Sequence, residues 1–376
     1  MNKNIQYKKL TDICEIITGE WGTEIKENSQ NIVSVIRTTN FLNNGKIDIQ
    51  NKELVKREMD KNKIEQKKLK KGDIIIEKSG GSPNQPVGRV VFFNLNSNDI
   101  FLCNNFTSIL RIKEKINSKY IFYFLRNSYK NNKVLKFQNK TTGIINLKLQ
   151  DYLNGSCIYL PELRIQNKVV NILDILESIL EKNQNYLNYL KELTKSLFTK
   201  YSDSKIVKSF YIKDISSELF AGGDKPNDYS ETTSKEYIYP VYSNGEKKEG
   251  LLCFSKTFKV DKEALTISAR GTIGFTVIRK ACFTPVVRLI TLIPNKNNNI
   301  IYLKYAIEEL NLKKLGSGVA QLTIPVFSKY KLNLPPIELQ NKFAERIEKI
   351  EKLKFTIWKI ISKVYKTLKK KGVESN

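Results

Sequence analysis

The sequence of 376 residues contains no histidine. This absence removes the Ser-His and Cys-His nucleophile arrangements and the side chain that most often acts as a general base. Cysteine is scarce, with five residues far apart and no CxxC pair: Cys14, Cys103, Cys157, Cys253 and Cys282. A zinc site would need thiolates brought together from distant positions, so we expect buried structural thiols and no metal.

Sequence motifs for catalysis are also missing. The chain has no Gly-x-Gly-x-x-Gly, no Walker A sequence and no His-Glu-x-x-His. The tetrapeptide of adenine methyltransferases has Asn or Asp before two prolines, whereas Pro335-Pro336 follows Leu334. Asp12 and Asp214 are single carboxylates at predicted strand starts, and we interpret them as turn or cap residues. No catalytic residue and no cofactor-binding residue is therefore predicted in this chain.

Long apolar runs are absent as well. Runs such as Val90–Phe93 and Ile121–Leu125 are far shorter than the roughly 20 residues that cross a bilayer. The segment Met1–Asn4 leads into no apolar signal region. We therefore expect a cytoplasmic protein. Hydrophobic residues make up 40% of the chain, which is enough for a core in each of two domains and disfavours wholesale disorder.

Charge of one sign dominates the chain. It carries 64 Lys and Arg against 38 Asp and Glu, a formal net charge of +26. A surface this cationic indicates a polyanionic partner, and nucleic acid is the first candidate. Codon bias toward Lys, Asn and Ile is the alternative explanation. Such a bias would raise Glu too, so it does not readily explain the excess of one sign.

The same phrase closes both halves of the sequence. Leu160-Pro161 followed by Gln166-Asn167-Lys168 recurs as Leu334-Pro335 followed by Gln340-Asn341-Lys342, with identical internal spacing. Other segments match in the same order: Leu10–Ile13 with Ile212–Ile215, Lys71–Ile76 with Asp261–Ile267, Phe106-Thr107 with Phe283-Thr284, Tyr120–Tyr123 with Tyr302–Tyr305, and Gly143–Leu147 with Gly318–Leu322. This order indicates a duplicated domain whose copies differ by loop insertions.

Each copy is rich in short β-type runs bounded by Gly, Asn or Pro. The expected strands are Ile32–Arg37, Asp73–Glu77, Arg89–Phe93 and Ser108–Ile112 in the first copy, and Leu265–Ser268, Phe275–Ile278 and Val286–Ile293 in the second. One helix per copy is predicted, at Lys119–Leu125 and Tyr302–Leu310. The pattern favours a compact α+β domain with an irregular, mostly antiparallel sheet.

A long helix with heptad spacing follows each copy. The first seam is Leu173, Leu176, Leu180, Asn183, Leu187, Leu190, Thr194 and Leu197; the second is Phe343, Ile347, Ile350, Lys354, Ile357, Ile361, Val364 and Leu368. The helices could pair with each other or pack on their own domains. Polar Asn183 and Thr194 could fix register and partner, and Lys354 interrupts the second seam. A 30-residue helix spans about 45 Å, which is longer than the advance of about 34 Å in one turn of DNA.

These elements give the expected domain limits. The first domain is residues 1–160 and the central helix is 161–203. The second domain is residues 204–334 and the C-terminal helix is 335–372.

Three pairs of loops are candidates for DNA contact. Glu77–Arg89 mixes glycines, hydroxyls, amides and cations, and its partner is the shorter Ser268–Gly274. Backbone N–H groups and cations there suit phosphates, while Asn84 and Gln85 could read an adenine and Arg89 a guanine. The alternative is a tight structural turn with incidental charge.

The other two pairs are Lys140–Gly143 with Gly316–Gly318, and Arg37–Asn40 with Tyr242–Gly245. For both of these pairs structural turns remain the alternative. The candidate DNA-binding residues are Arg37, Thr38, Lys78, Ser79, Gly80, Asn84, Gln85, Arg89, Lys140, Thr141, Thr142, Ser243, Asn244, Arg270, Thr272 and Ser317.

The duplicated order resembles the specificity subunit of type I restriction–modification enzymes. The resemblance rests on Gly72–Gly81, its counterpart at 263–274, and the doubled Leu-Pro…Gln-Asn-Lys phrase, and it covers essentially the whole chain. It implies an α+β fold with two pseudo-symmetric target-recognition domains. Each domain would read one half of a split DNA sequence, and the two long helices would pair as an antiparallel coiled coil that fixes the gap.

The resemblance also implies partners. The subunit itself would have no catalytic activity. It would bind double-stranded DNA and dock two methyltransferase (modification) subunits, which bind S-adenosylmethionine and flip the target adenine. Restriction subunits with an ATP-driven motor would join for cleavage. The longer first loop, with Pro83 and Pro86, suggests that the two domains read different sequences.

Three other interpretations stay open at this point. The chain could be a different sequence-specific DNA-binding protein. It could be a stand-alone DNA methyltransferase or nuclease, although the sequence shows no cofactor pocket. It could also be a coiled-coil scaffold whose charge only solvates it, which would bind DNA with no sequence preference.

Overall fold

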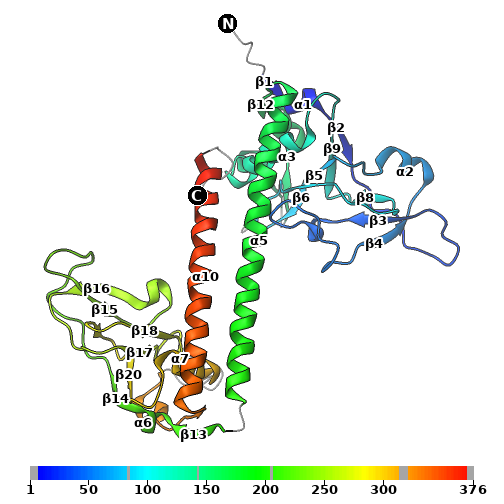
Figure 1. Cartoon of the computed structure of the whole chain (residues 1–376). Coiled ribbons are helices and arrows are strands. Elements are labelled where there is room, and N and C mark those ends of the chain that lie inside the picture. The colour runs from blue at the N-terminus through cyan, green and yellow to red at the C-terminus, as the bar shows by residue number, and fades with distance from the viewer. Residues whose placement is uncertain (1–6, 83–84, 142–143, 204–205, 313–320, 371–376) are drawn as a thin grey trace. The chain divides into compact units, whose positions relative to one another are not determined.

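The computed structural model describes residues 7–82, 85–141, 144–203, 206–312 and 321–370 (Figure 1). The chain divides into two compact units. Unit 1 is Met1–Asn183 with Ile360–Asn376, and unit 2 is Gln184–Lys359. Two long helices, α5 (Leu163–Ser202) and α10 (Ile337–Lys370), each contribute a segment to both units.

Unit 1 is built on two small sheets. The first is antiparallel, in the order β2 (Cys14–Thr18), β9 (Thr107–Ile112), β5 (Ile74–Glu77) and β7 (Val90–Phe92). The second has the order β4 (Val55–Glu58), β3 (Ile32–Ile36) and β8 (Phe101–Cys103), with β3 and β8 parallel. The remaining strands are β1 (Tyr7–Lys9) with β12 (Cys157–Tyr159), and β10 (Gln138–Thr141) with β11 (Ile144–Leu147) and β6 (Ser79–Gly81). The helices are α1 (Leu10–Ile13), α2 (Lys61–Lys67), α3 (Ser118–Lys130) and α4 (Leu149–Asn154), with short 3-10 turns η1 (Thr38–Asn40) and η2 (Leu135–Phe137).

Unit 2 repeats this strand order. Its four-stranded sheet runs β14 (Ser216–Ala221), β20 (Ile290–Pro294), β17 (Ala264–Ile267) and β18 (Thr276–Arg279). Its second sheet runs β16 (Leu251–Ser255), β15 (Tyr239–Tyr242) and β19 (Thr284–Pro285), again with one parallel pair, and β13 (Lys208–Tyr211) pairs with β21 (Lys331–Leu334). The other elements are α6 (Ile212–Ile215), α7 (Ile300–Glu309), α9 (Ile324–Phe327) and the 3-10 turn η3 (Lys247–Gly250). The predicted domain duplication and α+β class are confirmed.

The helix of each unit packs on its four-stranded sheet. In unit 1, Phe122 and Leu125 of α3 belong to one buried cluster with Ile74 and Ile76 of β5. In unit 2, Leu303 and Ile307 of α7 share a cluster with Leu265 of β17 and Leu292 of β20. Burying each such side chain contributes about 1.5–3 kcal/mol, so these clusters hold each helix against its sheet.

Both helices begin at an asparagine cap. The Asn117 Oδ1 accepts from the N–H groups of Lys119 (2.9 Å) and Tyr120 (3.1 Å). The Asn299 Oδ1 accepts from those of Ile301 (2.9 Å) and Tyr302 (3.3 Å). Such a cap contributes about 1 kcal/mol because it satisfies helix N–H groups that have no partner within the helix.

The doubled phrase joins these caps to the long helices. In unit 1 the Gln166 Oε1 accepts from Asn117 N (2.9 Å), while its Nε2 donates to Pro161 O (2.8 Å). Asn117 Nδ2 donates to the Asn167 Oδ1 (2.7 Å). The phrase therefore ties the start of α5 to the start of α3.

Unit 2 repeats the same network atom for atom. The Gln340 Oε1 accepts from Asn299 N (2.9 Å), and its Nε2 donates to Pro335 O (2.9 Å). Asn299 Nδ2 donates to the Asn341 Oδ1 (2.9 Å). Gln166 and Gln340 are both buried, so the repeated residues are structural and mark where each long helix attaches.

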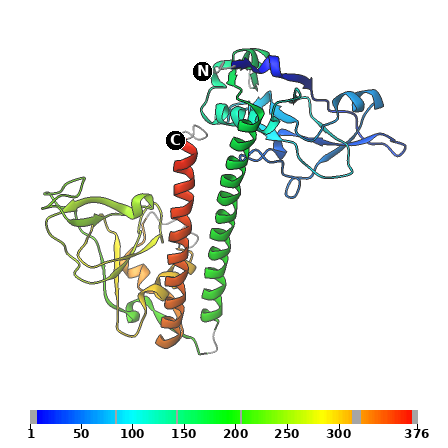
Figure 2. The ribbon, with the colours of Figure 1, turned by 45° about the horizontal axis from the view of Figure 1, so that its top comes forward.

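Segments of α5 and α10 run alongside each other within each unit (Figure 2). In unit 1, Val364 near the end of α10 shares a buried cluster with Val170 and Leu173 near the start of α5. In unit 2, Phe343 near the start of α10 lies 5.8 Å, ring centre to ring centre, from both Phe198 and Tyr201 near the end of α5. Opposite ends meet, so the helices pair antiparallel as the resemblance implied.

The polar residues of the predicted seams bond within their own helices. Asn183 Nδ2 donates to Ile179 O (2.7 Å), and Thr194 Oγ1 donates to Leu190 O (2.8 Å). Lys354 forms an ion pair with Glu351 at 2.8 Å. These contacts satisfy the polar groups without a partner helix, so the idea that they select register stays a prediction.

One predicted strand is wrong. The run Val286–Ile293 is not continuous, because only Ile290–Pro294 forms β20 and Thr284–Pro285 forms β19. Between them Val287 (φ 54°) and Arg288 (φ 63°) adopt left-handed backbone conformations. The β-propensity of two valines is overridden here by a turn.

Candidate DNA-recognition interface

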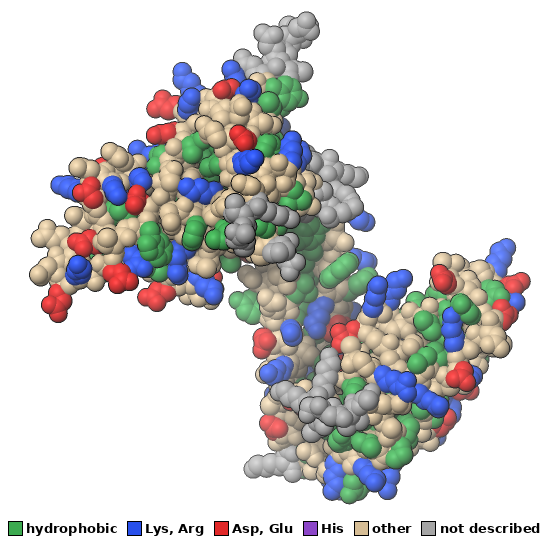
Figure 3. Space-filling model, turned by 180° about the vertical axis from the view of Figure 1, so that it is seen from behind, with side chains coloured by type: hydrophobic (Ala, Val, Ile, Leu, Met, Phe, Trp, Pro, Cys, Tyr) green, Lys and Arg blue, Asp and Glu red, His purple; other side chains and the backbone are tan. Residues whose placement is uncertain are grey.

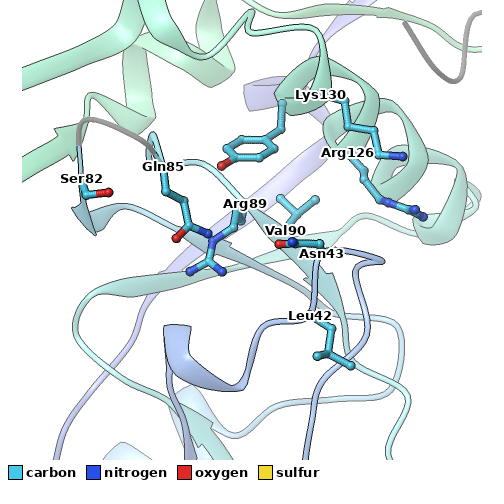
Figure 4. Close-up of a pocket in the computed structure, with 9 residues that line it drawn as sticks. Leu42, Asn43, Ser82, Gln85, Arg89, Val90, Arg126 and Lys130 are labelled. Atoms are coloured by element: carbon cyan, nitrogen blue, oxygen red, sulfur yellow. The ribbon is translucent and has the colours of Figure 1, made fainter. Parts of the chain in front are cut away.

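A groove of about 600 Å³ opens on unit 1 (Figure 4). It is lined by Ser82, Gln85 and Arg89 from the predicted 77–89 loop. The opposite wall carries residues that sequence reasoning missed: Leu42, Asn43, Arg126, Tyr129 and Lys130. The groove thus joins the loop after β5, the turn after η1 and the C-terminal half of α3.

Arg89 sits at the floor of this groove in an ion pair. Its Nε and Nη2 donate to the two carboxylate oxygens of Glu77 (2.9 and 2.8 Å), and Nη2 also reaches Thr38 O (3.3 Å). Burial lowers the pKa of Arg89, but the hydrogen bond and charge of Glu77 outweigh it, so the pKa is raised. Glu77 and Thr38 engage Nε and Nη2, so only Nη1, which also contacts Gln85, is left for the predicted contact with a guanine.

Gln85 lies beside this guanidinium (Figure 4). With its amide oxygen turned inward, the Gln85 Oε1 accepts from Arg89 Nη1 at 3.1 Å. Gln85 is itself exposed. Its amide therefore lies where it can meet a base edge, and Arg89 holds its orientation.

Lys78, Ser79 and Gly80 form the start of the loop. Lys78 is half-buried, and burial lowers the pKa of its ammonium. Among the described residues no hydrogen bond or ion pair engages its Nζ. A partly desolvated cation in this position suits a phosphate oxygen. Gly80 has φ 99°, a conformation that favours glycine.

The segment after β3 has a structural asparagine. The Asn40 Oδ1 accepts from Arg37 N (3.0 Å), and its Nδ2 donates to Asp48 O and Lys52 O (3.1 Å each). Asn40 is fully buried, so it fixes the turn and offers no amide to DNA. Arg37 and Thr38 are only partly exposed, and Thr38 contributes its carbonyl to Arg89.

The rest of the unit 1 candidates lie near the loop or outside the described residues. Lys140 and Thr141 belong to β10, which pairs with β11, and β11 pairs with β6 next to Gly80. The structure thus brings parts of two separately predicted loops, 77–89 and 140–143, to one small sheet. Asn84 and Thr142 lie outside the described residues.

In unit 2 a single side chain connects three loops. The Asn244 Oδ1 accepts from Ala269 N (2.7 Å), and its Nδ2 donates to Val287 O (2.7 Å). Gly245 N donates to the Ser268 Oγ (3.2 Å). Two loops that the sequence predicted separately, Tyr242–Gly245 and Ser268–Gly274, are therefore adjacent. Both ends of the Asn244 amide bond to backbone, so this side chain holds the turn at Val287 against the loop at Ala269.

The remaining unit 2 candidates differ in exposure. Ser243 is partly buried, and its N–H donates to Gly250 O. Arg270 is exposed and donates from Nε to the Gln321 Oε1 at 3.0 Å. The Thr272 Oγ1 is buried and has no hydrogen-bond partner among the described residues. Ser317 lies outside the described residues.

Sequence reasoning also missed cations of unit 2. Lys247 and Lys248 are exposed on η3, beside Asn244. Arg288 is exposed on the turn between β19 and β20. The Lys-Lys pair could have been found as a charge run after a strand, whereas Arg288 was hidden in the run predicted to be one strand.

Metal-ligating groups do not gather in the part of the chain that the structure describes. Across those ranges no three or more Cys, Asp or Glu side chains lie where they could hold one ion. Cys14, Cys103 and Cys253 are buried free thiols, as expected, and burial raises the pKa of Cys14 and Cys103 to about 11. Cys157 is exposed, contrary to the expectation. No described helix has the length and apolar content to cross a membrane.

The chain is similar to several known proteins. A family model described as the type I restriction modification DNA specificity domain matches residues 2–192 and 205–371. A Mycoplasma pneumoniae protein named as a type I specificity subunit is 31% identical over 268 residues, which covers 66% of this chain and 77% of that one. A Methanocaldococcus jannaschii protein named as the specificity subunit of type I restriction enzyme MjaX is 26% identical, covering 93% and 87%.

Solved structures share the fold. The crystal structure of a type I restriction–modification S subunit from M. genitalium has a TM-score of 0.67 at 15% identity, covering 100% of this chain and 98% of that one. A chain from a study of assembly and conformational transition of a type I system has a TM-score of 0.51 at 13% identity. Because the family model spans both halves of the sequence, and the duplicated strand order and paired helices accompany it, this chain belongs to the type I restriction–modification DNA specificity family.

Proposed function

We propose that this chain reads a bipartite DNA target, with unit 1 reading one half and unit 2 the other. The observation that carries the proposal is a shared framework with different loops. The strand order is the same in both units, yet Gln85 and Arg89 shape the loop of unit 1 and Asn244 organises the loops of unit 2. Equivalent scaffolds with unlike loops suit two different half-sites.

Within each unit we assign contacts by the chemistry of the side chains. Gln85 and Arg270 are exposed side chains with base-reading chemistry. Lys78, Lys140 and the hydroxyls of Ser79 and Thr141 are proposed phosphate contacts, since phosphate contacts set affinity and position. Lys and Arg side chains are spread over the face of both units shown in Figure 3, which suits attraction to the DNA backbone.

The long helices carry an exposed apolar face. Tyr186, Tyr189 and Leu193 of α5 are 57%, 69% and 47% exposed, and their spacing places them on one face. Phe355 and Trp358 of α10 are 61% and 65% exposed. Large exposed aromatics grouped on a helix are typical of a protein-binding surface. We assign this surface to docking of the two methyltransferase subunits that the family implies.

Catalysis is then the work of the partners. The chain is proposed to be non-catalytic, with S-adenosylmethionine bound by the methyltransferase subunits and ATP-driven cleavage supplied by restriction subunits. The proposed limits are residues 1–160 and 204–334 for the reading domains, and 161–203 and 335–372 for the helices. A subunit that acts on host DNA works in the cytoplasm.

Mapping of methylated adenines in the host genome tests the function. The expected result is a motif of two short half-sites separated by a fixed gap, which disappears when the gene for this chain is deleted. The methyltransferase gene is left intact as the matched control. A bipartite motif that survives the deletion contradicts the proposal, as does methyl transfer by the purified chain without partners.

A further inference from the structure

The turn between β19 and β20 of unit 2 is strained. Val287 and Arg288 are consecutive non-glycine residues in the left-handed region, at φ 54° and 63°. A β-branched residue rarely adopts this conformation, because its side chain then lies too close to the backbone. Both side chains are exposed, so burial of apolar surface does not compensate for the strain.

The backbone of this turn is nevertheless fixed on both sides. Val287 N donates to Gly223 O (2.8 Å) and Arg288 N to Gly222 O (3.0 Å). Val287 O accepts from Asn244 Nδ2 at 2.7 Å. Gly222 packs so closely that an added Cβ would lie 2.6 Å from the Pro285 carbonyl carbon. The surrounding structure therefore fixes the position of the Arg288 backbone from which the side chain extends.

Unit 1 makes the equivalent turn without strain. There Thr107 N donates to Asn104 O (3.0 Å), as Leu289 N donates to Val286 O (3.1 Å) in unit 2. Gly19 packs on the unit 1 turn as Gly222 packs on its counterpart. No residue from Asn104 to Thr107 has a positive φ. The shared framework therefore does not require the left-handed pair, and backbone strain that the fold does not require is typical of binding sites.

Arg288 also has suitable neighbours. Asn244 connects its turn to the loop that bears exposed Arg270. Shortly after Asn244 in the chain, η3 bears exposed Lys247 and Lys248. The Glu249 carboxylate of η3 lies 3.5 Å from Arg279. Among the described residues no hydrogen bond or ion pair engages the Arg288 guanidinium. A fixed, unengaged arginine within a group of cations is suited to a DNA base edge flanked by phosphates.

We propose that Arg288 is a specificity-determining residue that reads a base edge in the half-site of unit 2, and that Asn244 is the positioning residue that fixes the Arg288 turn. The inference rests on the proposed function and names the residues that perform it in unit 2. Arginine paired with the O6 and N7 atoms of guanine is the commonest specific contact in the major groove. The base that Arg288 reads is therefore expected to be a guanine.

The test uses the whole complex in cells whose sole copy of this chain carries a substitution, with methylated adenines mapped genome-wide. Arg288→Ala is expected to leave one half-site and the gap unchanged and to make the other half-site degenerate at one position, with discrimination there reduced roughly tenfold or more. Arg288→Lys keeps the charge but not the fork, so it should relax the same position. Lys280→Ala, an exposed cation of unit 2 outside these loops, is the matched control.

The two units and the two proposals are separated by further variants. Gln85→Ala should affect the other half-site, which assigns each half to its unit. A wild-type complex with no bipartite motif overturns the proposed function. A normal wild-type motif that Arg288→Ala leaves intact overturns only this inference. If the Arg288→Lys complex keeps the wild-type motif, a positive charge is sufficient at this position. Arg288 would then be a phosphate contact, and this inference would be overturned.

Asn244→Asp tests the positioning role. The introduced carboxylate would still accept from Ala269 N but could not donate to Val287 O. The Asn244→Asp substitution should therefore reduce base discrimination at the same half-site position as Arg288→Ala. Combined with Arg288→Ala it should reduce discrimination no further, because both substitutions remove the same contact. A loss of methylation spread evenly over all sites, with a lowered thermal midpoint, would indicate a merely structural role and contradict the assignment.

Discussion

Buried ion pairs hold the loops of unit 1 in place. Glu77 and Arg89 expose 4% and 16% of their side chains, and Asp73 and Arg111 expose 3% and 20%. Each arginine binds its carboxylate through two nitrogens. A buried pair of this kind is weak as a source of stability but costly to break, because one charge is then left without a partner.

Glu77→Gln is therefore expected to destabilise the chain. It removes the charge opposite Arg89 and should lower the free energy of unfolding by about 3 kcal/mol, as measured by urea denaturation of the full chain. Glu218→Gln is the control, since Glu218 and Lys262 form an exposed pair, 47% and 56% exposed, whose loss should cost less than about 1 kcal/mol. Equal effects of the two substitutions would refute the structural role of the Glu77–Arg89 pair.

The sequence predicted polar candidates at the loops but not the contacts that each of them makes. Arg89 and Asn244 were both identified as candidates, and both lie at the predicted loops. Their roles depend on partners distant in the chain, such as Thr38 for Arg89 and Val287 for Asn244. Composition and spacing cannot reveal that a side chain is already engaged. Exposed Arg288 was missed for another reason, because it lies in a run that was predicted to be one strand.

At the scale of elements, the repeated glutamine is the joint between reading domain and long helix. Gln166 and Gln340 each accept from the N–H of an N-cap asparagine and donate to the carbonyl of a proline that lies two residues before the long helix begins. Periodicity predicted the long helices and the helix of each domain, because their apolar faces are continuous. The exact pairing of short strands was not predictable, since it depends on contacts between distant segments.

Gln340→Ala should weaken this joint in unit 2. It leaves the Asn299 N–H and the Pro335 carbonyl without their partner in a buried place, which is expected to cost about 2 kcal/mol of unfolding free energy. Lys342→Ala alters an exposed residue of the same phrase and should change stability by less than about 0.5 kcal/mol. Thermal and urea unfolding would be measured for both variants. If their unfolding curves do not differ, Gln340 does not stabilise the junction between the domain and α10.

At the scale of the whole molecule, the duplicated framework and the net charge of +26 divide the work of recognition. Phosphate contacts depend on many interchangeable cations and lose affinity as salt rises, whereas base contacts depend on a few fixed side chains. The composition of the sequence revealed the phosphate contacts as an excess of cations, and the order of its motifs revealed the repeat. The base contacts lie in loops whose conformation differs between the units, which is why the half-sites cannot be read from the sequence.

Lengthening both long helices should change the gap and leave the half-sites alone. One added heptad in α5 and one in α10 keep the seam in phase and lengthen each helix by about 10 Å, which corresponds to about three base pairs of DNA. Genome-wide mapping of methylated adenines should therefore show the same two half-sites with a longer gap. Inserting four residues in place of seven shifts the seam out of phase and should abolish methylation altogether. If the heptad variant instead changes the bases within a half-site, the helices are part of the reading surface and do not act as a spacer.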